Sequence, residues 1–544
     1  MDRPASRPPS SPAVRRTAAG DLRPWLLLVA LLAIAVYLNG IPGEFVFDDK
    51  LIQRDPRING QESFWTIFVT DYWYKYIGTS ADLYRPLTIA SYALNRMVAG
   101  LSSPAFHVVN IALHAVVSVL VVLLTEAVLR DRRLAVVAGL LFAAHPVHTE
   151  AVTGIVGRAE VLSTLFLLLA LYLQARAWTG RDRGRSAWMP LGLLAYFCAL
   201  ASKETAIVGP GLAALVDYVR QGCETPGSSG QPRRWDIRRT LGLVGLYVAV
   251  AAVYLLLRYS VVGRFIQKPP VRSYTLLFGQ PVATRVFTAL EILAVYLRLL
   301  FFPVTLSADY SYRQVPLLDA PNAVALAGAL ASVALIAAFV WAVRRQVSPA
   351  MFALGFFGVS YAIIANFPVP LQVLVAERLL YLPSVGFCVG VAWAGLGLAQ
   401  RYAATLPGGV GRVAPAVALV VMVTLYGVRT VVRNVDWRTP EAIYAATVRD
   451  SPECHAAHFN YSAILLRQPG KSDLALHHLL KAYEIRQDYY PALVNLASVY
   501  LGRGEPAKAR EFAQKGLALH PDGRQLKGVL AEAERRLGQQ PPPP

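Results

Sequence analysis

Long apolar runs separated by short polar segments dominate this 544-residue chain from residue 25 to residue 432. Most runs are about 15 to 25 residues long, the length that an α-helix needs to cross the hydrocarbon of a bilayer. The runs occupy residues 25–38, 105–129, 134–144, 151–175, 188–201, 205–219, 241–262, 286–302, 323–343, 351–365, 379–398 and 413–432. This pattern predicts an all-α, polytopic membrane protein.

Arginines gather in the short segments between the apolar runs, at 130–133, 176–185, 233–239 and 344–345. Cationic loops stay on the cytoplasmic side of a membrane, and so does an Arg-rich N-terminus. All of these segments fall on that side if 286–302 lies along the outer surface instead of crossing. We therefore predict about eleven crossings, with an uncleaved first span, in the cell (inner) membrane. The polar turns between spans then face the periplasm.

Composition supports the membrane class, because 55% of the residues are hydrophobic and only 16% are charged. A soluble protein carries roughly a quarter charged residues. The net charge of +19 follows from the orienting loops, and no stripe of basic and aromatic residues indicates a nucleic-acid surface. The spacing of the four cysteines matches neither a metal knuckle nor a redox pair. Lipid and protein, and not nucleic acid, are the expected partners.

From residue 436 the composition becomes that of a soluble helical domain, and a segment around Leu493 to Tyr500 repeats one about 34 residues earlier. This pattern is typical of tetratricopeptide repeats, whose stacked helix pairs form a groove for extended peptides. A structural cap on the membrane part is the alternative role. We expect four segments: a disordered cytoplasmic N-terminus (1–23), a membrane domain (24–435), a repeat α-solenoid (436–540) and a disordered Pro tail (541–544).

An acidic pair, Asp48-Asp49, follows the first apolar run where the chain leaves the membrane. Charged residues near a bilayer are costly and mark chemistry more often than packing. Adjacent carboxylates can supply a base and a positioning group, or ligands for a divalent cation. In a strand-like loop the two side chains point in opposite directions, so one can face a site while the other fixes the loop. A solvated loop or a helix cap is the alternative.

A second charged pair, Glu377-Arg378, enters the apolar run at 379–398. Arginine can bind a phosphate group through two parallel hydrogen bonds. Snorkelling of an arginine at a helix end is the alternative, although it needs no neighbouring Glu. The pair is therefore a candidate anion site on the same side as the acidic pair.

Other outward turns carry polar residues that are candidates for substrate contact: Arg85, His145, His148, Glu150, Arg158, Glu160, Lys203, Glu204 and Tyr312. The His-x-x-His-x-Glu spacing at 145–150 lies at a turn with Pro146, which favours substrate contact or turn structure over zinc. Arg158 and Glu160 either pair with each other or line the cavity. Lys203-Glu204 forms either an exposed ion pair or a cavity wall. No metal ligands are assigned and no cofactor is certain, while a divalent cation stays open.

Six of these segments, taken in order, are similar to one family. They are 45–49 (FVFDD), 84–87 (YRPL), 145–160 (HPVHTEAV and GRAE), 201–205 (ASKET), 306–312 (LSADYSY) and 377–384 (ERLLYLPS). With the C-terminal repeats they resemble the transmembrane and tetratricopeptide repeat-containing (TMTC) O-mannosyltransferases over residues 25–537. The chain has fewer repeats than eukaryotic members, and its Arg- and Ala-rich composition resembles that of a bacterial relative.

The resemblance implies an inverting, GT-C-type enzyme. Such an enzyme moves a sugar, typically mannose, from a polyprenyl-phosphate donor to Ser or Thr hydroxyls of proteins on the extracytoplasmic side. Asp48 or Asp49 is then the catalytic base, while Arg378 holds the donor phosphate and Glu377 orients it. An apolar groove holds the lipid, and the repeats present the acceptor protein. The alternative function is a non-catalytic repeat scaffold or a lipid-linked sugar transporter of the envelope.

Overall fold

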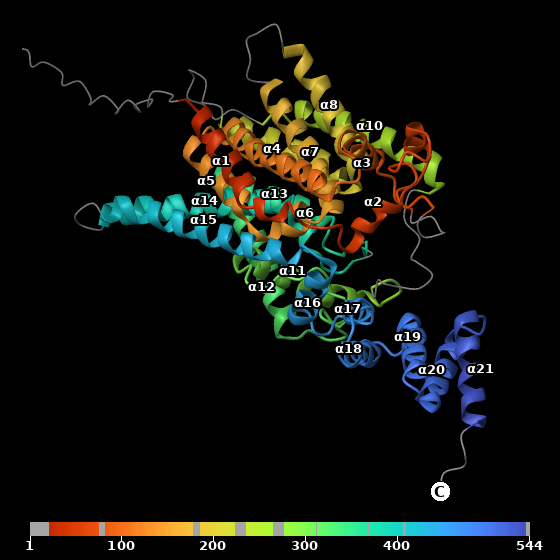
Figure 1. Cartoon of the computed structure of the whole chain (residues 1–544). Coiled ribbons are helices and arrows are strands. Elements are labelled where there is room, and N and C mark those ends of the chain that lie inside the picture. Colours follow the sequence, from red (N-terminus) through yellow and green to blue (C-terminus); the bar gives the residue numbers. More distant parts are fainter. Residues whose placement is uncertain are drawn as a thin grey trace, which may run out of the picture.

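The computed structural model describes residues 21–75, 82–177, 185–223, 235–264, 277–311, 313–367, 369–371, 373–405 and 410–539. Within these residues the chain forms α- and 3₁₀-helices and no strands (Figure 1). Most helices form one large body, and the last three extend from it at one corner. The predicted fold class, an all-helical membrane protein with a C-terminal helical repeat, is confirmed.

Each of the twelve apolar runs lies mainly on one helix. The helices are α1 (Arg23–Ala35), α4 (Ser103–Leu129), α5 (Arg132–Ala144), α7 (Arg158–Ala177), α8 (Arg185–Ser202), α9 (Gly209–Cys223), α10 (Ile237–Val262), α11 (Val282–Phe301), α12 (Ala323–Arg344), α13 (Ser348–Ala362), α14 (Pro383–Thr405) and α15 (Val410–Asp436). The lengths and positions of the apolar runs were therefore enough to place these helices.

Seven helices in the described ranges are long and apolar enough to span a membrane: Arg23–Gly40, Ser103–Leu129, Ile155–Ala177, Ile237–Val262, Ala323–Arg344, Pro383–Tyr402 and Val413–Asp436. An eighth candidate is the pair Arg132–Ala144 and Pro146–Val152, if these helices, bent by 52°, form one span. The predicted eleven crossings are thus not confirmed. Helix α11 is not among the candidates, and its course along the membrane surface stays a prediction.

Glycine allows helices of the body to approach closely. A Cβ atom at Gly328 would lie 1.9 Å from the carbonyl oxygen of Leu290, so α12 packs directly on the backbone of α11. Burial of apolar surface gives little energy between helices in lipid, so close backbone packing of this kind contributes much of their association. The other side of α12 stays exposed, as the 72% exposure of Leu330 shows. This exposed side is the expected lipid-facing surface.

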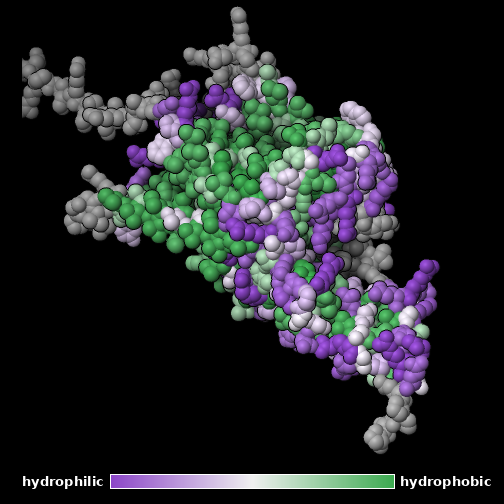
Figure 2. Space-filling model, viewed as in Figure 1, coloured by the Kyte–Doolittle hydropathy of each residue, from purple (hydrophilic) through white to green (hydrophobic). Residues whose placement is uncertain are grey.

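Short helices make up the polar end of the body. They are η2 (Phe47–Asp49), α2 (Lys50–Arg54), α3 (Pro86–Ala99), α6 (Thr149–Val152), η5 (Ile155–Gly157), η6 (Glu204–Val208) and η7 (Glu377–Leu380). Helix α3 begins at a proline, which suits the first helical position, and ends at Gly100, whose φ is 65°. Figure 2 shows hydrophilic residues over the end near α2 and over the repeats, whereas the rest of the body is largely hydrophobic.

Six helices follow α15 in the segment predicted as the repeat domain, and this name is kept for them: α16 (Pro440–Asp450), α17 (His455–Leu465), α18 (Ser472–Ile485), α19 (Tyr490–Gly502), α20 (Pro506–Leu519) and α21 (Arg524–Gly538). The Thr439 hydroxyl caps α16 by accepting a hydrogen bond from the backbone N–H of Ala442. Leu493, Leu496 and Ala497, which the repeat pattern predicts as buried, lie in the core of α19 to α21. Each helix packs on the next, as in an α-solenoid.

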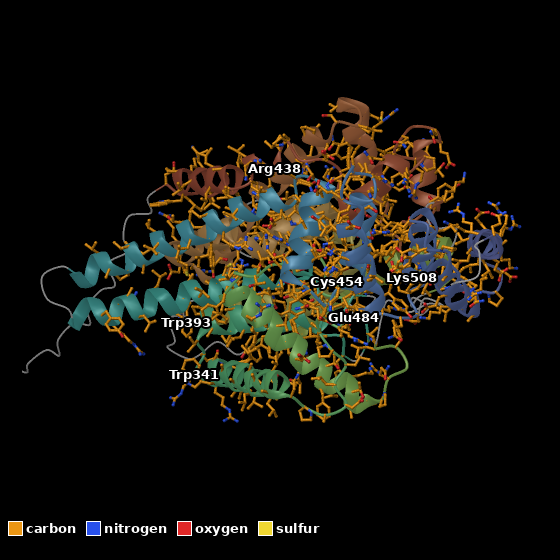
Figure 3. All side chains as sticks on the ribbon, turned by 60° about the horizontal axis from the view of Figure 1, so that its bottom comes forward. Trp341, Trp393, Arg438, Cys454, Glu484 and Lys508 are labelled. Carbon is orange, nitrogen blue, oxygen red and sulfur yellow. The ribbon has the colours of Figure 1, made fainter. Side chains whose placement is uncertain are left out.

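The first repeat helices pack against the polar end of the membrane part. Trp437 and Tyr444 form an apolar cluster with Val46 and Ala308. The junction, where Arg438 and Cys454 lie, is seen in Figure 3. The repeat domain therefore covers one side of the segment that carries Asp48.

Candidate active site

Asp48 and Asp49 lie in the 3₁₀-turn η2 and have different surroundings. The Asp49 carboxylate is 1% exposed and accepts hydrogen bonds from the backbone N–H groups of Val46 (3.2 Å) and Val156 (2.8 Å). Asp49 thereby fixes the turn to η5. Asp48 is partly exposed and makes no hydrogen bond or ion pair within the described residues. Asp48 is therefore the carboxylate that is free to act on a substrate.

The turn that presents Asp48 is strained at Phe47. Its φ of 53° lies in the left-handed region, which bulky residues rarely adopt. The Phe47 ring packs at 6.0 Å from the ring of Tyr444 on α16. Strain of this kind persists where the surroundings hold it, and it is common at functional sites. The repeat domain thus helps to hold Asp48 in place.

Arg378 is held by Glu150, a residue 228 positions earlier in the chain. Its Nη1 donates to one oxygen of Glu150, and its backbone N–H donates to the other at 2.8 Å. Glu150 is 2% exposed, whereas the guanidinium of Arg378 remains partly exposed. The prediction that Glu377 orients Arg378 is wrong, because Glu150 does so. The contact candidate Glu150 is accordingly reassigned as a positioning residue.

Glu377 has a different set of partners from its neighbour Arg378. Its Oε1 accepts hydrogen bonds from the backbone N–H of Ser307 (2.5 Å) and the hydroxyl of Tyr310 (2.7 Å). Burial raises the pKa of Glu377 to about 7, although the charge of Arg433 opposes the shift. Glu377 thus holds the loop between α11 and α12.

Asp48 and Arg378 each shift the pKa of the other, although they form no ion pair within the described residues. Burial raises the pKa of Asp48, the charge of Arg378 works against this, and Asp309 adds to it. Burial lowers the pKa of Arg378, but Glu150 and Asp48 outweigh burial and raise it overall. The Asp48 carboxylate and the Arg378 guanidinium thus lie within range of each other's charge.

Two further ion pairs lie within range of the charge of Arg378 or of Tyr72, which also interacts with Asp48. Arg85 binds Glu204 at two points, with Nε–Oε2 and Nη2–Oε1 distances of 2.8 and 2.5 Å, and Lys203 donates to Glu160. Burial would raise the pKa of Glu204, but Arg85 holds it at about 2. The ring of Tyr72 lies 5.1 Å from the Arg85 guanidinium, and its hydroxyl interacts with the charges of Arg85 and Asp48. These contacts favour a cavity wall over an ion pair between Lys203 and Glu204.

His145 and His148, expected as substrate contacts, are fully buried. The Nε2 of His145 is bonded to the carbonyl oxygen of Leu300 (3.0 Å), and its Nδ1 accepts from the backbone N–H of Val147. The Nε2 of His148 shares a hydrogen bond with the hydroxyl of Ser384 (2.8 Å). The assignment as substrate contacts is corrected: the two rings join the turn after α5 to α11 and α14.

Arg158 is also a structural residue. It is fully buried and donates to the side-chain oxygens of Asn110 (2.6 Å) and Asn95 (2.9 Å) and to the carbonyl oxygen of Phe106 (3.0 Å). It does not pair with Glu160. Its guanidinium ties α7 to α3 and α4, so its assignment as a substrate contact is corrected as well.

We expect Arg158→Met to lower the melting temperature of the detergent-solubilised protein. The change leaves three buried acceptors without their donor, and each such loss costs about 1–3 kcal/mol. Arg345→Met, at an exposed position before α13, is the matched control and should leave the melting temperature unchanged. Equal melting temperatures for the two variants would show that Arg158 does not hold the three helices together.

Asp309 is a functional candidate that sequence reasoning missed. It is partly exposed, lies near Asp48, and accepts a hydrogen bond from the backbone N–H of Ser311 at 2.8 Å. Its place in a polar outward turn was the available signal. Tyr312, which was predicted, lies outside the described residues. Within those residues, no group of three or more His, Cys, Asp or Glu side chains is placed to hold a metal ion.

Comparison with known proteins confirms the resemblance. A tetratricopeptide-repeat family model matches residues 466–533. Mouse protein O-mannosyl-transferase TMTC1 is 28% identical over 87% of this chain and 59% of its own length. Human TMTC1 is 30% identical over 87% and 56%, and human TMTC3 is 27% identical over 91% and 55%. The homologues of this chain are thus the TMTC protein O-mannosyl-transferases, and the chain spans somewhat more than half of their length.

Two solved structures are similar in the course of their helices, each with a TM-score of 0.40. One is the archaeal oligosaccharyltransferase AglB from Archaeoglobus fulgidus, in complex with an inhibitory peptide and a dolichol-phosphate. It is 14% identical, over 84% of this chain and 59% of that one. The other is ArnT from Cupriavidus metallidurans bound to undecaprenyl phosphate, 16% identical over 95% and 89%.

Proposed function

We propose that this protein is a membrane-embedded, inverting glycosyltransferase of the GT-C type. It moves a sugar, mannose by analogy with its homologues, from a polyprenyl-phosphate donor to Ser or Thr hydroxyls of proteins. The single observation that carries the proposal is that the unbonded, partly exposed Asp48 carboxylate lies within range of the charge of the partly exposed Arg378 guanidinium. The partly exposed guanidinium of Arg378 supports a site for an anionic substrate group.

Asp48 and Arg378 have different roles in the proposed reaction. The Asp48 carboxylate takes the proton of the acceptor hydroxyl as its oxygen bonds to the anomeric carbon of the sugar. The bond from that carbon to the phosphate oxygen breaks, and polyprenyl phosphate leaves with the electron pair. Arg378 binds the phosphate and stabilises the charge that develops on it. Attack opposite the leaving phosphate inverts the anomeric carbon.

An apolar groove beside α11 is suited to the lipid of the donor. It has a volume of about 290 Å³ and is lined by Val286, Ala289, Leu290, Leu293, Ser332, Tyr361, Ala365 and Phe367. The ring of Tyr361 lies 6.1 Å from that of Tyr296, whose hydroxyl accepts a hydrogen bond from the backbone N–H of Ala376. Ala376 precedes Glu377-Arg378. The groove therefore lies between α11, α12 and the end of α13, and the contact of Tyr361 with Tyr296 links its lining to the segment before Arg378.

Filling this groove by Ala289→Trp is expected to raise the KM for a donor with a full-length polyprenyl chain. The KM for a donor with only two isoprene units should change much less, because its tail does not reach the groove. Both values are measured as initial rates of sugar transfer at varied donor concentration. Leu330→Trp on the exposed side of α12 is the matched control. An equal change with both donors would exclude the groove as the lipid site.

The proposal places the site and the repeats on the extracytoplasmic side of the cell membrane. The repeat domain packs beside Phe47 and Asp48, so an acceptor protein bound to its helices lies next to the base. Stacked helical repeats bind extended peptides, and an extended segment can bring its hydroxyl into a narrow site. The repeats would therefore present the acceptor.

The test is an assay of the purified protein in lipid vesicles, with radiolabelled polyprenyl-phosphate mannose and a Ser/Thr-rich peptide. The proposal predicts labelled peptide that is sensitive to α-mannosidase. Labelled lipid that crosses the vesicle unchanged, with unlabelled peptide, would instead indicate a transporter. Peptide binding without any movement of label would indicate a scaffold.

A further inference from the structure

The segment from Leu306 to Ser311 forms a firmly held loop beside the site. Glu377 binds it through the backbone of Ser307 and the hydroxyl of Tyr310, and both of these residues are buried. The Ser307 hydroxyl in turn donates to the carbonyl oxygen of Asp309 at 3.0 Å. Asp309, the charged residue of the loop, stays partly exposed.

The Asp309 carboxylate interacts with the side chains of Ser311 and Cys454. Its Oδ1 accepts a hydrogen bond from the backbone N–H of Ser311, and it makes no ion pair in the described part of the chain. Ala308, the residue before Asp309, packs in one apolar cluster with Val46, so the loop of Asp309 lies beside the turn that carries Asp48. Arg378, in contrast, is paired with Glu150. The candidate site thus has an edge, formed by the Asp48 turn and the Asp309 loop, whose two carboxylates make no ion pair within the described residues.

The same edge adjoins the repeat domain. The hydroxyl of Ser451, at the end of α16, donates to that of Ser307 at 2.8 Å. The hydroxyl of Ser311 lies 3.7 Å from the Sγ atom of Cys454, just before α17. A polypeptide that extends from the repeats to Asp48 therefore passes the loop that carries Asp309.

We propose that Asp309 binds the acceptor polypeptide beside its reacting hydroxyl and makes the enzyme prefer acceptors with a cationic residue there over acceptors with an acidic one. This inference rests on the proposed function. A Lys or Arg side chain compensates the two carboxylates, whereas an acidic side chain adds a third negative charge. Specificity of this kind uses attraction and repulsion together.

The test uses the full-length protein in vesicles and three peptides that differ only next to a single acceptor Thr. The neighbouring residue is Lys, Gln or Glu, and kcat/KM is measured for each. We expect the Lys peptide to exceed the Glu peptide by about two- to fivefold, the factor that one partly exposed ion pair supplies. Asp309→Asn should bring the three values together, mainly through KM.

Two variants serve as controls. Asp309→Glu keeps the charge and should keep the preference. Asp319→Asn removes an exposed acid of the same connecting segment and should leave the preference as in the wild type. Three equal values for an active wild type, or a preference unchanged in Asp309→Asn, would overturn this inference alone. A wild type that labels none of the peptides would instead reject the proposed function.

Discussion

Asp48→Asn is expected to lower the rate of sugar transfer by about 10²- to 10⁴-fold, the usual contribution of a general base. The amide keeps the shape of the side chain but cannot take the hydroxyl proton. Asp48 makes no hydrogen bond in the described structure, so the change should leave the melting temperature intact. The rate is measured with saturating donor and peptide, and a variant as active as the wild type would remove Asp48 from the mechanism.

The dependence of the rate on pH provides a second check on Asp48. The base must be ionised, so the wild-type rate should fall as pH drops through the pKa of Asp48. Burial raises that pKa above the ordinary carboxyl range, while Arg378 opposes the shift. The fall should therefore begin at a higher pH than for an exposed carboxylate, and Asp48→Asn should lack it. Asp49→Asn, in contrast, loosens the turn and should lower the melting temperature.

Arg378→Ala is expected to reduce kcat/KM by about 10²- to 10³-fold, as when one preorganised group that stabilises developing charge is removed. The reason is that the leaving phosphate loses its partner in the transition state. Arg378→Lys keeps the charge but not the two-point geometry, so its rate should lie between those of the wild type and Arg378→Ala. The measurement is the initial rate at low donor concentration.

Two further variants define the role of Arg378. Glu150→Gln leaves the guanidinium in place but weakens its support, and we expect a smaller loss than for Arg378→Ala. Arg345→Ala, an exposed arginine of a connecting segment, should have wild-type kinetics. A full rate in Arg378→Ala would contradict the phosphate-binding assignment.

The sequence identified both charged pairs as candidate site segments. It did not indicate which residue of each pair is partly exposed and which is held by neighbouring segments. Asp48-Asp49 and Glu377-Arg378 both lie in 3₁₀-turns, where successive side chains point about 120° apart. One member of each pair therefore reaches the site while the other holds a neighbouring segment. The identity of two adjacent residues does not predict which of them is exposed, because this depends on the segments that surround the turn.

Long-range partners were the other part that the sequence could not predict. Glu150 and Arg378 are 228 positions apart, and nothing in either segment favours this pair over Glu377 with Arg378. His145 and Arg158 have side chains of types that often bind substrates, yet here both are buried, and they bond to groups of α11 and α3, respectively. The packing of helices that are distant in sequence decides whether a polar residue lines a cavity or forms hydrogen bonds with buried polar groups.

The most direct test of the account is a structure of the Asp48→Asn protein with polyprenyl-phosphate mannose and an acceptor peptide bound. The account predicts the donor phosphate on the guanidinium of Arg378, with the peptide hydroxyl between residue 48 and the anomeric carbon. A phosphate bound away from Arg378, or a sugar that residue 48 cannot approach, would contradict it.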